Sequence, residues 1–355
     1  MKALLFLFLT TCPLLAQPAN ILVIVAGDLG ADSFPLTATG GTQASMPNLT
    51  ALKNSGVLFT NAHSQPTCSP TRASILTGRH PFRTGIGAQL TGATSPQLSA
   101  AEFTLPEAFT TNAGLGFSMA MFGKWHLNAG AGTNDTPRTI GGWPHFAGAI
   151  AGAIPDYSAW TKVVNNVATV TTEYATTDTA NDVISFIQAQ PPGTPWFAWA
   201  AFHAPHAPLH VPPAHLHSYG TPTTNRGMYE AMCQALDTEV GRVLSAVNLA
   251  DTHVIFLGDN GTGRDGKGTV TELGARVPLI VRGPGVAKDT VTDELASVSD
   301  IFPTLAELAG AKLPSDRELD GVSLVPTLHD PAAPHREWIF SYLTDRRMLR
   351  DKRWL

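Results

Sequence analysis

The sequence predicts an α/β protein in which a mostly parallel sheet is covered by helices on both faces. Six short apolar runs, rich in β-branched or aromatic residues, are typical of strands that are buried on both sides. Helical patterns separate these runs, and such alternation is typical of β-α-β units. The chain has 355 residues, 43% of them hydrophobic, which is enough for one large or two moderate domains with a sizeable core.

The predicted elements alternate along most of the chain. Strands are expected at residues 21–26, 57–60, 117–122, 196–202, 253–257 and 277–281, where apolar runs such as ILVIVA and WFAWAAF occur. Helices are expected at residues 47–54, 69–76, 105–112, 176–189, 228–247 and 297–308. Met232, Leu236 and Val240 recur at helical spacing around Cys233, which places that thiol in the core. Residues 90–99 and 129–154 lack sustained periodicity and are predicted to be long surface loops.

The charge content argues against several classes of protein. Charged residues make up 14% of the chain, well below the roughly 25% of an average soluble domain. The formal net charge is −5 and no block of Lys and Arg occurs, so nucleic acid is not an expected partner. After the N-terminal segment no stretch reaches 18 apolar residues, so no integral membrane span is expected.

The first 16 residues are typical of a secretory signal peptide. Lys2 provides a positive charge, residues 3–9 form a short apolar run, and Ala16 suits a cleavage point. The alternative is a buried N-terminal strand, although residues 21–26 already supply one. Thr11 before Cys12 fits a lipoprotein site poorly. We therefore expect a secreted or periplasmic protein.

Removal of the signal peptide would leave two cysteines, Cys68 and Cys233, which are too few for a disulfide framework. Cys68 lies in QPTCSPTRASILTG, at the start of a helix that Ser69 and Pro70 begin. A helix N-terminus lowers the pKa of a thiol, so a thiolate nucleophile is the direct interpretation. A Cys/His hydrolase with His126 or His206 as the base is one possibility that this pattern leaves open.

Three oxygen-bearing side chains follow predicted strands and suit a hard cation such as Ca²⁺ or Mg²⁺. Asp28 comes after the first strand, and Asp259 and Asn260 come after the strand at residues 253–257. The alternative for Asp259 and Asn260 is an ordinary turn, because Asp-Asn-Gly is favoured in turns. The thiolate of Cys68 would be a poor ligand for such a cation, so the site calls for an oxygen nucleophile at that position.

Five basic side chains form a second group of candidates. In open α/β sheets ligands bind at the carboxyl ends of the strands, and several of these residues fall there. Convergence beside a cation would create a site for a tetrahedral oxyanion, either phosphate or sulfate. Taken singly, each has an ordinary explanation as a solvated strand end, a packed loop histidine or a surface charge. The five are Arg72, Lys124, His126, His206 and Lys267.

The sequence around these residues resembles the sulfatase family. The segment CSPTR at 68–72 matches the family signature C-x-P-x-R, which directs oxidation of the cysteine to formylglycine. Further matches follow in the family's order: NILVIVAGDLG, MPNLTALKNSGVLFTNAHS, GKWHL, AFHAPHAPLHVP, GDNG and GKGTVTELGARVPLIVRGPG. The resemblance covers nearly all of residues 20–355 and implies an alkaline-phosphatase-like α/β sandwich, with a catalytic domain at 20–334.

The resemblance also implies roles for the candidates. Cys68, converted by a formylglycine-generating maturation enzyme, would supply a hydrate oxygen that attacks the sulfur of an aryl sulfate or a sulfated carbohydrate. Arg72 would hold the modified residue, and His126 would take a proton from its second hydroxyl. Lys124, His206 and Lys267 would bind the sulfate, with His206 or Lys267 protonating the leaving alcohol. The cation, Ca²⁺ or alternatively Mg²⁺, would be held by Asp28, Cys68 in its modified form, Asp259 and Asn260.

The sequence departs from the family pattern in two places. The first strand usually ends in two aspartates, and here the pair is Gly27-Asp28, so we expect weakened but real metal dependence. The ending DRRMLRDKRWL resembles the opening strand of the family's small C-terminal subdomain, so residues 335–355 are expected to begin a truncated subdomain.

Other functions and roles stay open at this point. A catalytically impaired, glycan-binding sulfatase-like protein is one alternative, motivated by Gly27. A phosphatase or phosphodiesterase on the same scaffold is another, although such an enzyme is expected to carry Ser or Thr at position 68. Aromatic residues such as Trp143, Tyr157 and Trp160 could line a sugar-binding cleft or pack in the core.

Overall fold

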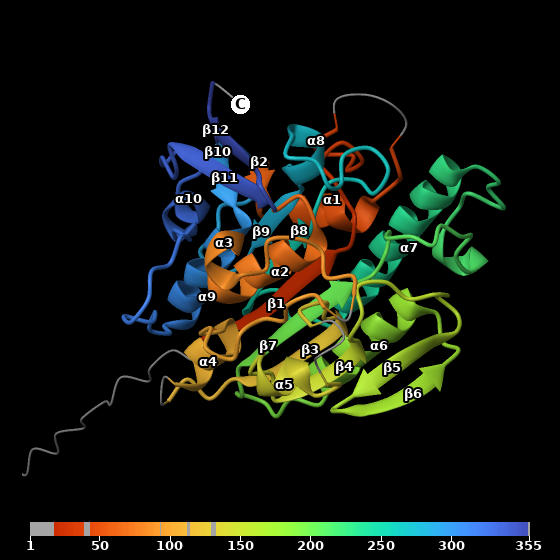
Figure 1. The fold of residues 1–355 in the computed structure, drawn as a ribbon, viewed down its shortest axis with the longest axis horizontal. Helices are drawn as coiled ribbons and strands as arrows, with labels where there is room; N and C mark the ends of the chain where they lie inside the picture. Colours follow the sequence, from red (N-terminus) through yellow and green to blue (C-terminus); the bar gives the residue numbers. More distant parts are fainter. Residues whose placement is uncertain (1–17, 39–42, 93, 112–113, 129–132, 354–355) are drawn as a thin grey trace, which may run out of the picture.

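The computed structural model describes residues 18–38, 43–92, 94–111, 114–128 and 133–353. The predicted signal peptide at 1–16, with Cys12, lies outside this part of the chain. A ten-stranded sheet runs through the molecule in the order β10-β2-β9-β8-β1-β7-β3-β4-β5-β6 (Figure 1). Its strands are β1 (Asn20–Ala26), β2 (Val57–His63), β3 (Ser118–Lys124), β4 (His145–Ala149), β5 (Trp160–Val164), β6 (Val167–Thr171), β7 (Trp196–Phe202), β8 (Thr252–Gly258), β9 (Leu279–Arg282) and β10 (Thr290–Ser297).

The centre of the sheet is parallel. β1 pairs in parallel with β7 and β8, and β3 pairs in parallel with β7 and β4. Strand β9 runs antiparallel to both of its neighbours, and β5 and β6 form an antiparallel edge. The predicted mostly parallel α/β fold is therefore confirmed, and the carboxyl ends of β8, β1, β7 and β3 meet at one edge.

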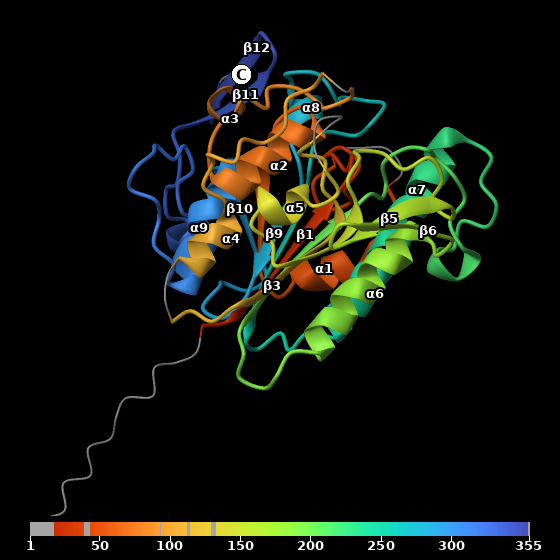
Figure 2. The same cartoon turned by 60° about the horizontal axis from the view of Figure 1, so that its bottom comes forward.

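Helices cover both faces of the sheet (Figure 2). Side chains at alternate positions of β1 point to opposite faces: Leu22 and Ile24 pack with α1, α6 and α7, whereas Val23 and Val25 pack with α2, α4 and α9. The helices are α1 (Pro47–Lys53), α2 (Cys68–Thr77), α3 (Pro81–Thr84), α4 (Leu105–Thr110), α5 (Thr136–Thr139), α6 (Ala175–Gln188), α7 (Asn225–Ser245), α8 (Glu272–Ala275), α9 (Ile301–Ala309) and α10 (Val325–His329), with 3₁₀ turns at Ala214–Leu216 and Val298–Asp300.

All six predicted strands and all six predicted helices are present, with their ends shifted by a few residues. The helix predicted at 297–308 begins later, because Ser297 ends β10 and forms a capping box with Asp300. The prediction of a long surface loop at 129–154 is wrong in part, since α5 and β4 lie within it. A Cβ on Gly148 would lie 1.9 Å from the carbonyl oxygen of Gly123 on β3. Position 148 of β4 therefore needs glycine, which interrupts the apolar run of this short strand.

The aromatic residues of the middle region are core residues. Trp143, Tyr157 and Trp160 are all buried, and the Trp143 ring lies 5.0 Å from that of Phe197. Core packing, rather than a sugar-binding cleft, therefore accounts for these side chains. In the described part of the chain, no helix combines the length and the apolar character needed to cross a membrane.

The C-terminal residues form a separate two-stranded antiparallel sheet, β11 (Trp338–Leu343) with β12 (Arg346–Asp351). Ser341 donates a hydrogen bond to the carbonyl oxygen of Ser64 (2.7 Å), and the amide of Tyr342 donates to the side chain of Gln65 (2.8 Å). This hairpin therefore rests against the segment that leads into α2. That it begins a further subdomain stays a prediction.

Candidate active site

The structure brings the candidate residues together at the carboxyl edge of the central strands. Lys124 ends β3, Asp28 follows β1, His206 follows β7, and Asp259 and Asn260 follow β8. These strands are neighbours in the sheet, so residues far apart in sequence meet at one place. Their chemical roles are taken up below as proposals.

Cys68 and Arg72 enter the site from helix α2. Cys68 is its first residue and is buried, and Arg72, one turn later, is 1% exposed. The Arg72 guanidinium donates to the carbonyl oxygen of Lys124 (2.6 Å) and to Oδ2 of Asp259 (2.9 Å). Charge-assisted bonds of this kind are stronger than neutral ones. Arg72 therefore fixes the start of α2 against the ends of β3 and β8.

Asp28 is the most connected carboxylate of the site. Its backbone has a left-handed φ of 61°, and its amide donates to Oδ1 of Asp259 (2.9 Å). Its Oδ1 accepts hydrogen bonds from Lys267 Nζ (2.7 Å) and Asn260 Nδ2 (2.9 Å). The hydroxyl of Tyr229 donates to its carbonyl oxygen (2.8 Å). These bonds hold the loops after β1 and β8 and helix α7 in one arrangement.

The electrostatic balance of the site is positive. Burial disfavours the ionised form of Asp259, but Lys124, Arg72 and Lys267 outweigh burial and hold the pKa of this carboxyl well below its usual range. Burial likewise opposes the charge on Lys267, yet Cys68 and the two aspartates raise its pKa. Three cations thus face two carboxylates, which leaves an excess of positive charge.

The site histidines are held in their neutral form. Burial, and next the charge of Lys124, lower the pKa of His206 to about 4. The same two causes lower the pKa of His126 well below its ordinary value. His206 donates its Nδ1–H to the carbonyl oxygen of Ala207 (2.6 Å), and its Nε2 lies 3.8 Å from Oδ2 of Asp28.

A backbone hydrogen bond and a close glycine fix the ring of His126. Its Nε2–H donates to the carbonyl oxygen of Leu90 (2.9 Å), so the neutral ring carries an unprotonated Nδ1. A Cβ on Gly152 would lie 2.1 Å from Cε1 of this ring. Gly152 is therefore needed for the position of His126. The sequence did not identify it, because a single glycine in a segment without periodicity carries no signal of its own.

Five buried polar atoms of the site have no hydrogen-bond partner within the described residues. They are Nε of Arg72, Nζ of Lys124, Nδ1 of His126, Nε2 of His203 and Oδ1 of Asn260. Buried polar atoms in proteins are almost always paired, so a cluster of unpaired ones indicates a place for a ligand. The burial of His203 and the charges of Lys124, His206 and Arg72 lower its pKa, so it lies among the cations.

The oxygen-bearing side chains fit a hard cation with few protein ligands. The unpaired Oδ1 of Asn260 lies beside Asp28 and Asp259, and such oxygens suit Ca²⁺. No group of three or more His, Cys, Asp or Glu side chains in the described ranges is arranged to hold a metal. Both oxygens of Asp32 accept hydrogen bonds from hydroxyl groups, Oδ1 from Thr262 (2.9 Å) and Oδ2 from Ser33 (3.1 Å).

Position 27 has no space for a side chain. A Cβ on Gly27 would lie 2.5 Å from the carbonyl oxygen of His203 and 3.3 Å from that of Phe202. Both contacts are with the backbone at the end of β7, which cannot rotate away as a side chain can. The glycine is thus a packing requirement of this chain.

The parallel sheet and its edge of cations and carboxylates define an α/β protein with an oxyanion site. The family model for sulfatases matches residues 19–311, and the chain belongs to the sulfatase family. N-acetylgalactosamine-6-sulfatase of Mus musculus is 32% identical over 360 residues, covering 88% of this chain and 66% of that protein. Arylsulfatase A of Bos taurus is 32% identical over 378 residues, covering 92% of this chain and 71% of that protein.

Solved structures agree with this assignment. The structure of Ps i-CgsB in complex with k-i-k-neocarrahexaose has a TM-score of 0.83 and 25% identity, covering 94% of this chain and 82% of that chain. The fold is the alkaline-phosphatase-like α/β sandwich that the resemblance implied. The chain spans 66% of the length of the N-acetylgalactosamine-6-sulfatases that it matches.

Proposed function

We propose that this protein hydrolyses sulfate esters of a sulfated carbohydrate, with a formylglycine made from Cys68 as its nucleophile. The observation that carries the proposal is the surplus of positive charge near the start of α2, where the buried Nζ of Lys124 has no hydrogen-bond partner among the described residues. A sulfate group is a compact oxyanion whose charge such donors stabilise. The family to which the chain belongs and the CSPTR segment at 68–72 support the choice of sulfate.

Each residue has a role that its contacts support. Lys124 Nζ, which is buried, has no hydrogen bond among the described residues and lies 3.9 Å from Oδ2 of Asp259, binds a sulfate oxygen, and Arg72 holds residue 68 through its position on the same helix. Nδ1 of His126 accepts a proton, since its Nε2–H is already donated to Leu90. Formylglycine, once formed, supplies a hydrated aldehyde whose oxygen attacks sulfur.

The proton for the leaving alcohol comes from Lys267 or His206. Of the two, Lys267 carries three donor protons on Nζ, one of them on Asp28. The neutral ring of His206 already donates its Nδ1–H to Ala207. The donor inventory therefore favours Lys267 for this step, and His206 would need a second ring proton, on Nε2, to donate to a sulfate oxygen.

We further propose that Asp28, Asp259 and Asn260, with an oxygen of the modified Cys68, hold Ca²⁺ or alternatively Mg²⁺. The bound ion supplies positive charge next to the sulfate. With glycine at position 27 the protein offers fewer oxygens than the six to eight that Ca²⁺ prefers, so its affinity is expected to be reduced.

The biological setting is part of the proposal. A segment typical of a signal peptide at residues 1–16 supports secretion or export to the periplasm, and a formylglycine-generating enzyme is the expected maturation partner. The names of the relatives support a sulfated sugar as substrate, and an aryl sulfate is a suitable model substrate. Residues 20–334 are proposed to form the catalytic domain and residues 335–355 the beginning of a C-terminal subdomain.

The decisive experiment is sulfate release by the protein co-produced with a formylglycine-generating enzyme. Mass spectrometry of the peptide that contains residue 68 measures the conversion, and an aryl sulfate and defined sulfated sugars serve as substrates. Cys68→Ala is the blank, and Cys68→Ser controls for a hydroxyl that cannot form the aldehyde hydrate. Protein that carries formylglycine at position 68 and binds sulfated glycans, but releases no sulfate from any of these substrates, would support the non-catalytic alternative that Gly27 suggests.

A further inference from the structure

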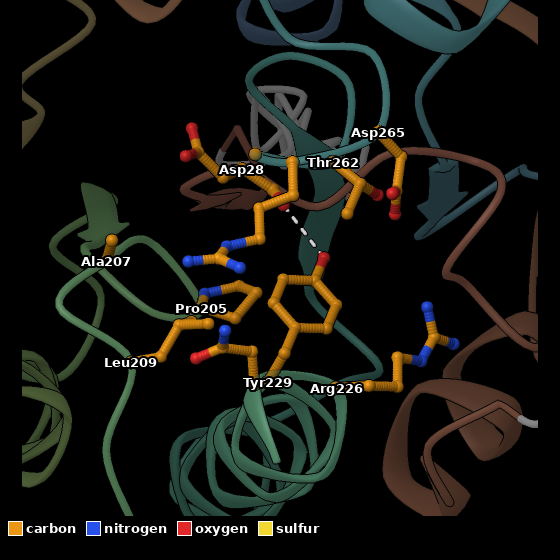
Figure 3. Close-up of a pocket in the computed structure, with 11 residues that line it drawn as sticks. Asp28, Pro205, Ala207, Leu209, Arg226, Tyr229, Thr262 and Asp265 are labelled. Carbon is orange, nitrogen blue, oxygen red and sulfur yellow. Dashed lines mark hydrogen bonds between the residues drawn. The ribbon is translucent and has the colours of Figure 1, made fainter.

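A cavity of about 300 Å³ opens beside the proposed catalytic residues (Figure 3). Asp28, which binds Lys267, lies in its wall, and Pro205 and Ala207, on either side of His206, line it as well. Both candidate donors for the leaving alcohol are therefore next to this cavity. Its position is the one that the leaving sugar of a sulfate ester would take, and its volume suits a single ring.

One wall of the cavity is apolar and rigid. Pro205, Ala207 and Leu209 form it, with the ring of Tyr229 at the base. Figure 3 shows the Tyr229 ring between Pro205 and Leu209 on one side and Arg226 and Asp265 on the other. The Tyr229 hydroxyl donates to the carbonyl oxygen of Asp28 (2.8 Å), which fixes the ring. Such a wall suits the face of a sugar ring.

Arg264 is one of the polar residues in the cavity wall that the proposed catalysis does not use. It is exposed, and its guanidinium has no ion-pair or hydrogen-bond partner among the described residues. The other arginine in the cavity wall, Arg226, differs, because its Nε donates to Glu230 (2.7 Å). An unpaired guanidinium facing a ligand site offers a planar fork for a carboxylate or a sulfate.

The turn that carries Arg264 also carries Lys267. The amides of Asp265, Gly266 and Lys267 all donate to the carbonyl oxygen of Thr262, at 3.1, 3.1 and 3.2 Å. The hydroxyl of Thr262 in turn donates to Asp32 (2.9 Å). The two cations are thus held on one ordered turn, with Lys267 directed to Asp28 and Arg264 in the cavity wall.

We propose that Arg264 is a specificity residue that binds a second oxyanion on the leaving sugar, either a carboxylate or a second sulfate. This inference rests on the proposed sulfate-ester hydrolysis and adds the substrate class: a sugar sulfate with a further negative charge on its leaving group. Asp265, on the same turn, limits where that charge can lie, because it would repel an anion on its own side of Tyr229.

The test compares three substrates that differ only in the second charge. They are a disaccharide with one sulfate ester and no other charge, the same compound with a uronic acid in place of its neutral sugar, and the same neutral disaccharide with a second sulfate. Kinetics are measured for the wild-type protein with formylglycine at position 68, for Arg264→Gln and Arg264→Lys, and for Arg346→Gln. The last variant removes an exposed arginine of β12 and controls for the change in net charge.

We expect Arg264→Gln to lower kcat/KM about 10-fold, mainly through KM, for one of the doubly charged substrates. The monosulfate should change less than about 2-fold, and Arg264→Lys should recover part of the loss. Which substrate is affected tells a carboxylate from a second sulfate. Equal losses on all three substrates, or none, would overturn this inference while leaving sulfate-ester hydrolysis intact. A wild-type protein inactive on every sulfate ester would overturn both.

Discussion

Replacing Gly27 tests whether this position is a vacant metal ligand or a packing requirement. A Cβ there would lie 2.5 Å from the carbonyl oxygen of His203. That oxygen already accepts the amide of His206 (2.9 Å), and the amide of Gly27 donates to the carbonyl oxygen of Ala204 (3.1 Å). Relief of the contact must therefore move the turn that carries His206.

The expected cost follows from the geometry. Overpacking by a methyl group typically costs about 1–3 kcal/mol, so Gly27→Ala should lose about 2 kcal/mol of unfolding free energy. An unfolding entropy of about 2.1 cal/mol/K per residue gives about 0.7 kcal/mol/K for a domain of this size. The melting temperature should therefore fall by about 3 °C. The melting temperature of the Gly27→Asp variant should fall by at least as much, because the larger side chain meets the same backbone atoms.

The assay is thermal unfolding in a chelator and in millimolar Ca²⁺. Gly92→Ala is the matched control, because a Cβ on Gly92 meets no atom within 4 Å. Its melting temperature should stay within about 1 °C of the wild type, since the loss of backbone entropy in the unfolded state is worth less than about 1 kcal/mol. A Gly27→Asp variant as stable as the wild type in chelator, and stabilised more by Ca²⁺, would refute the packing argument.

Four further predictions concern charges and the cation. His253, whose pKa burial and then Arg282 lower to about 4, binds a proton more weakly in the folded state. Stability should therefore fall by about 2 kcal/mol as the pH drops from about 6.5 to 4, and His253→Asn should show a smaller drop by chemical denaturation. Asp300 accepts hydrogen bonds from Arg336, His335 and two backbone amides, so Asp300→Asn should cost about 3–5 kcal/mol in the same assay; a loss under 1 kcal/mol would contradict this. Arg72→Lys should lower sulfate release by about 100-fold or more with the fold retained by circular dichroism. Chelation should lower sulfate release and added Ca²⁺ should restore it, and activity untouched by chelator would contradict a bound cation.

The centre of the sheet could be predicted from the sequence because its strands are continuous apolar runs. Residues 196–202 are apolar throughout and form β7 as expected, since a strand buried on both faces needs no polar positions. Four strands of this sheet, β4, β5, β6 and β10, were not predicted, and two of them lack an apolar run for the opposite reason. β4 needs Gly148 to approach β3, and β10 carries Asp293 and Glu294 where its register to β2 shifts. Neither strand can show a continuous apolar run.

The sequence predicted which residues gather at the site, but it did not predict the contacts between them. Strand ends place Asp28, Lys124 and Asp259 at one edge, which follows from the parallel sheet alone. That Arg72 binds Asp259, 187 residues away, depends on how α2 lies against β8. The contact between Gly152 and His126, and the closed space at Gly27, likewise depend on tertiary packing that no local pattern records.

The charge balance links Gly27 to the rest of the site. An aspartate at that position would give three carboxylates against Arg72, Lys124 and Lys267, and a divalent cation would then be needed to leave a positive pocket for sulfate. With glycine there, two carboxylates face three cations, and the pocket is positive before any metal binds. In the proposed cation site, the packing that excludes a side chain at position 27 would thus lower both the number of ligands and the need for them. Attraction of the sulfate should accordingly depend more on the buried lysine than on the cation.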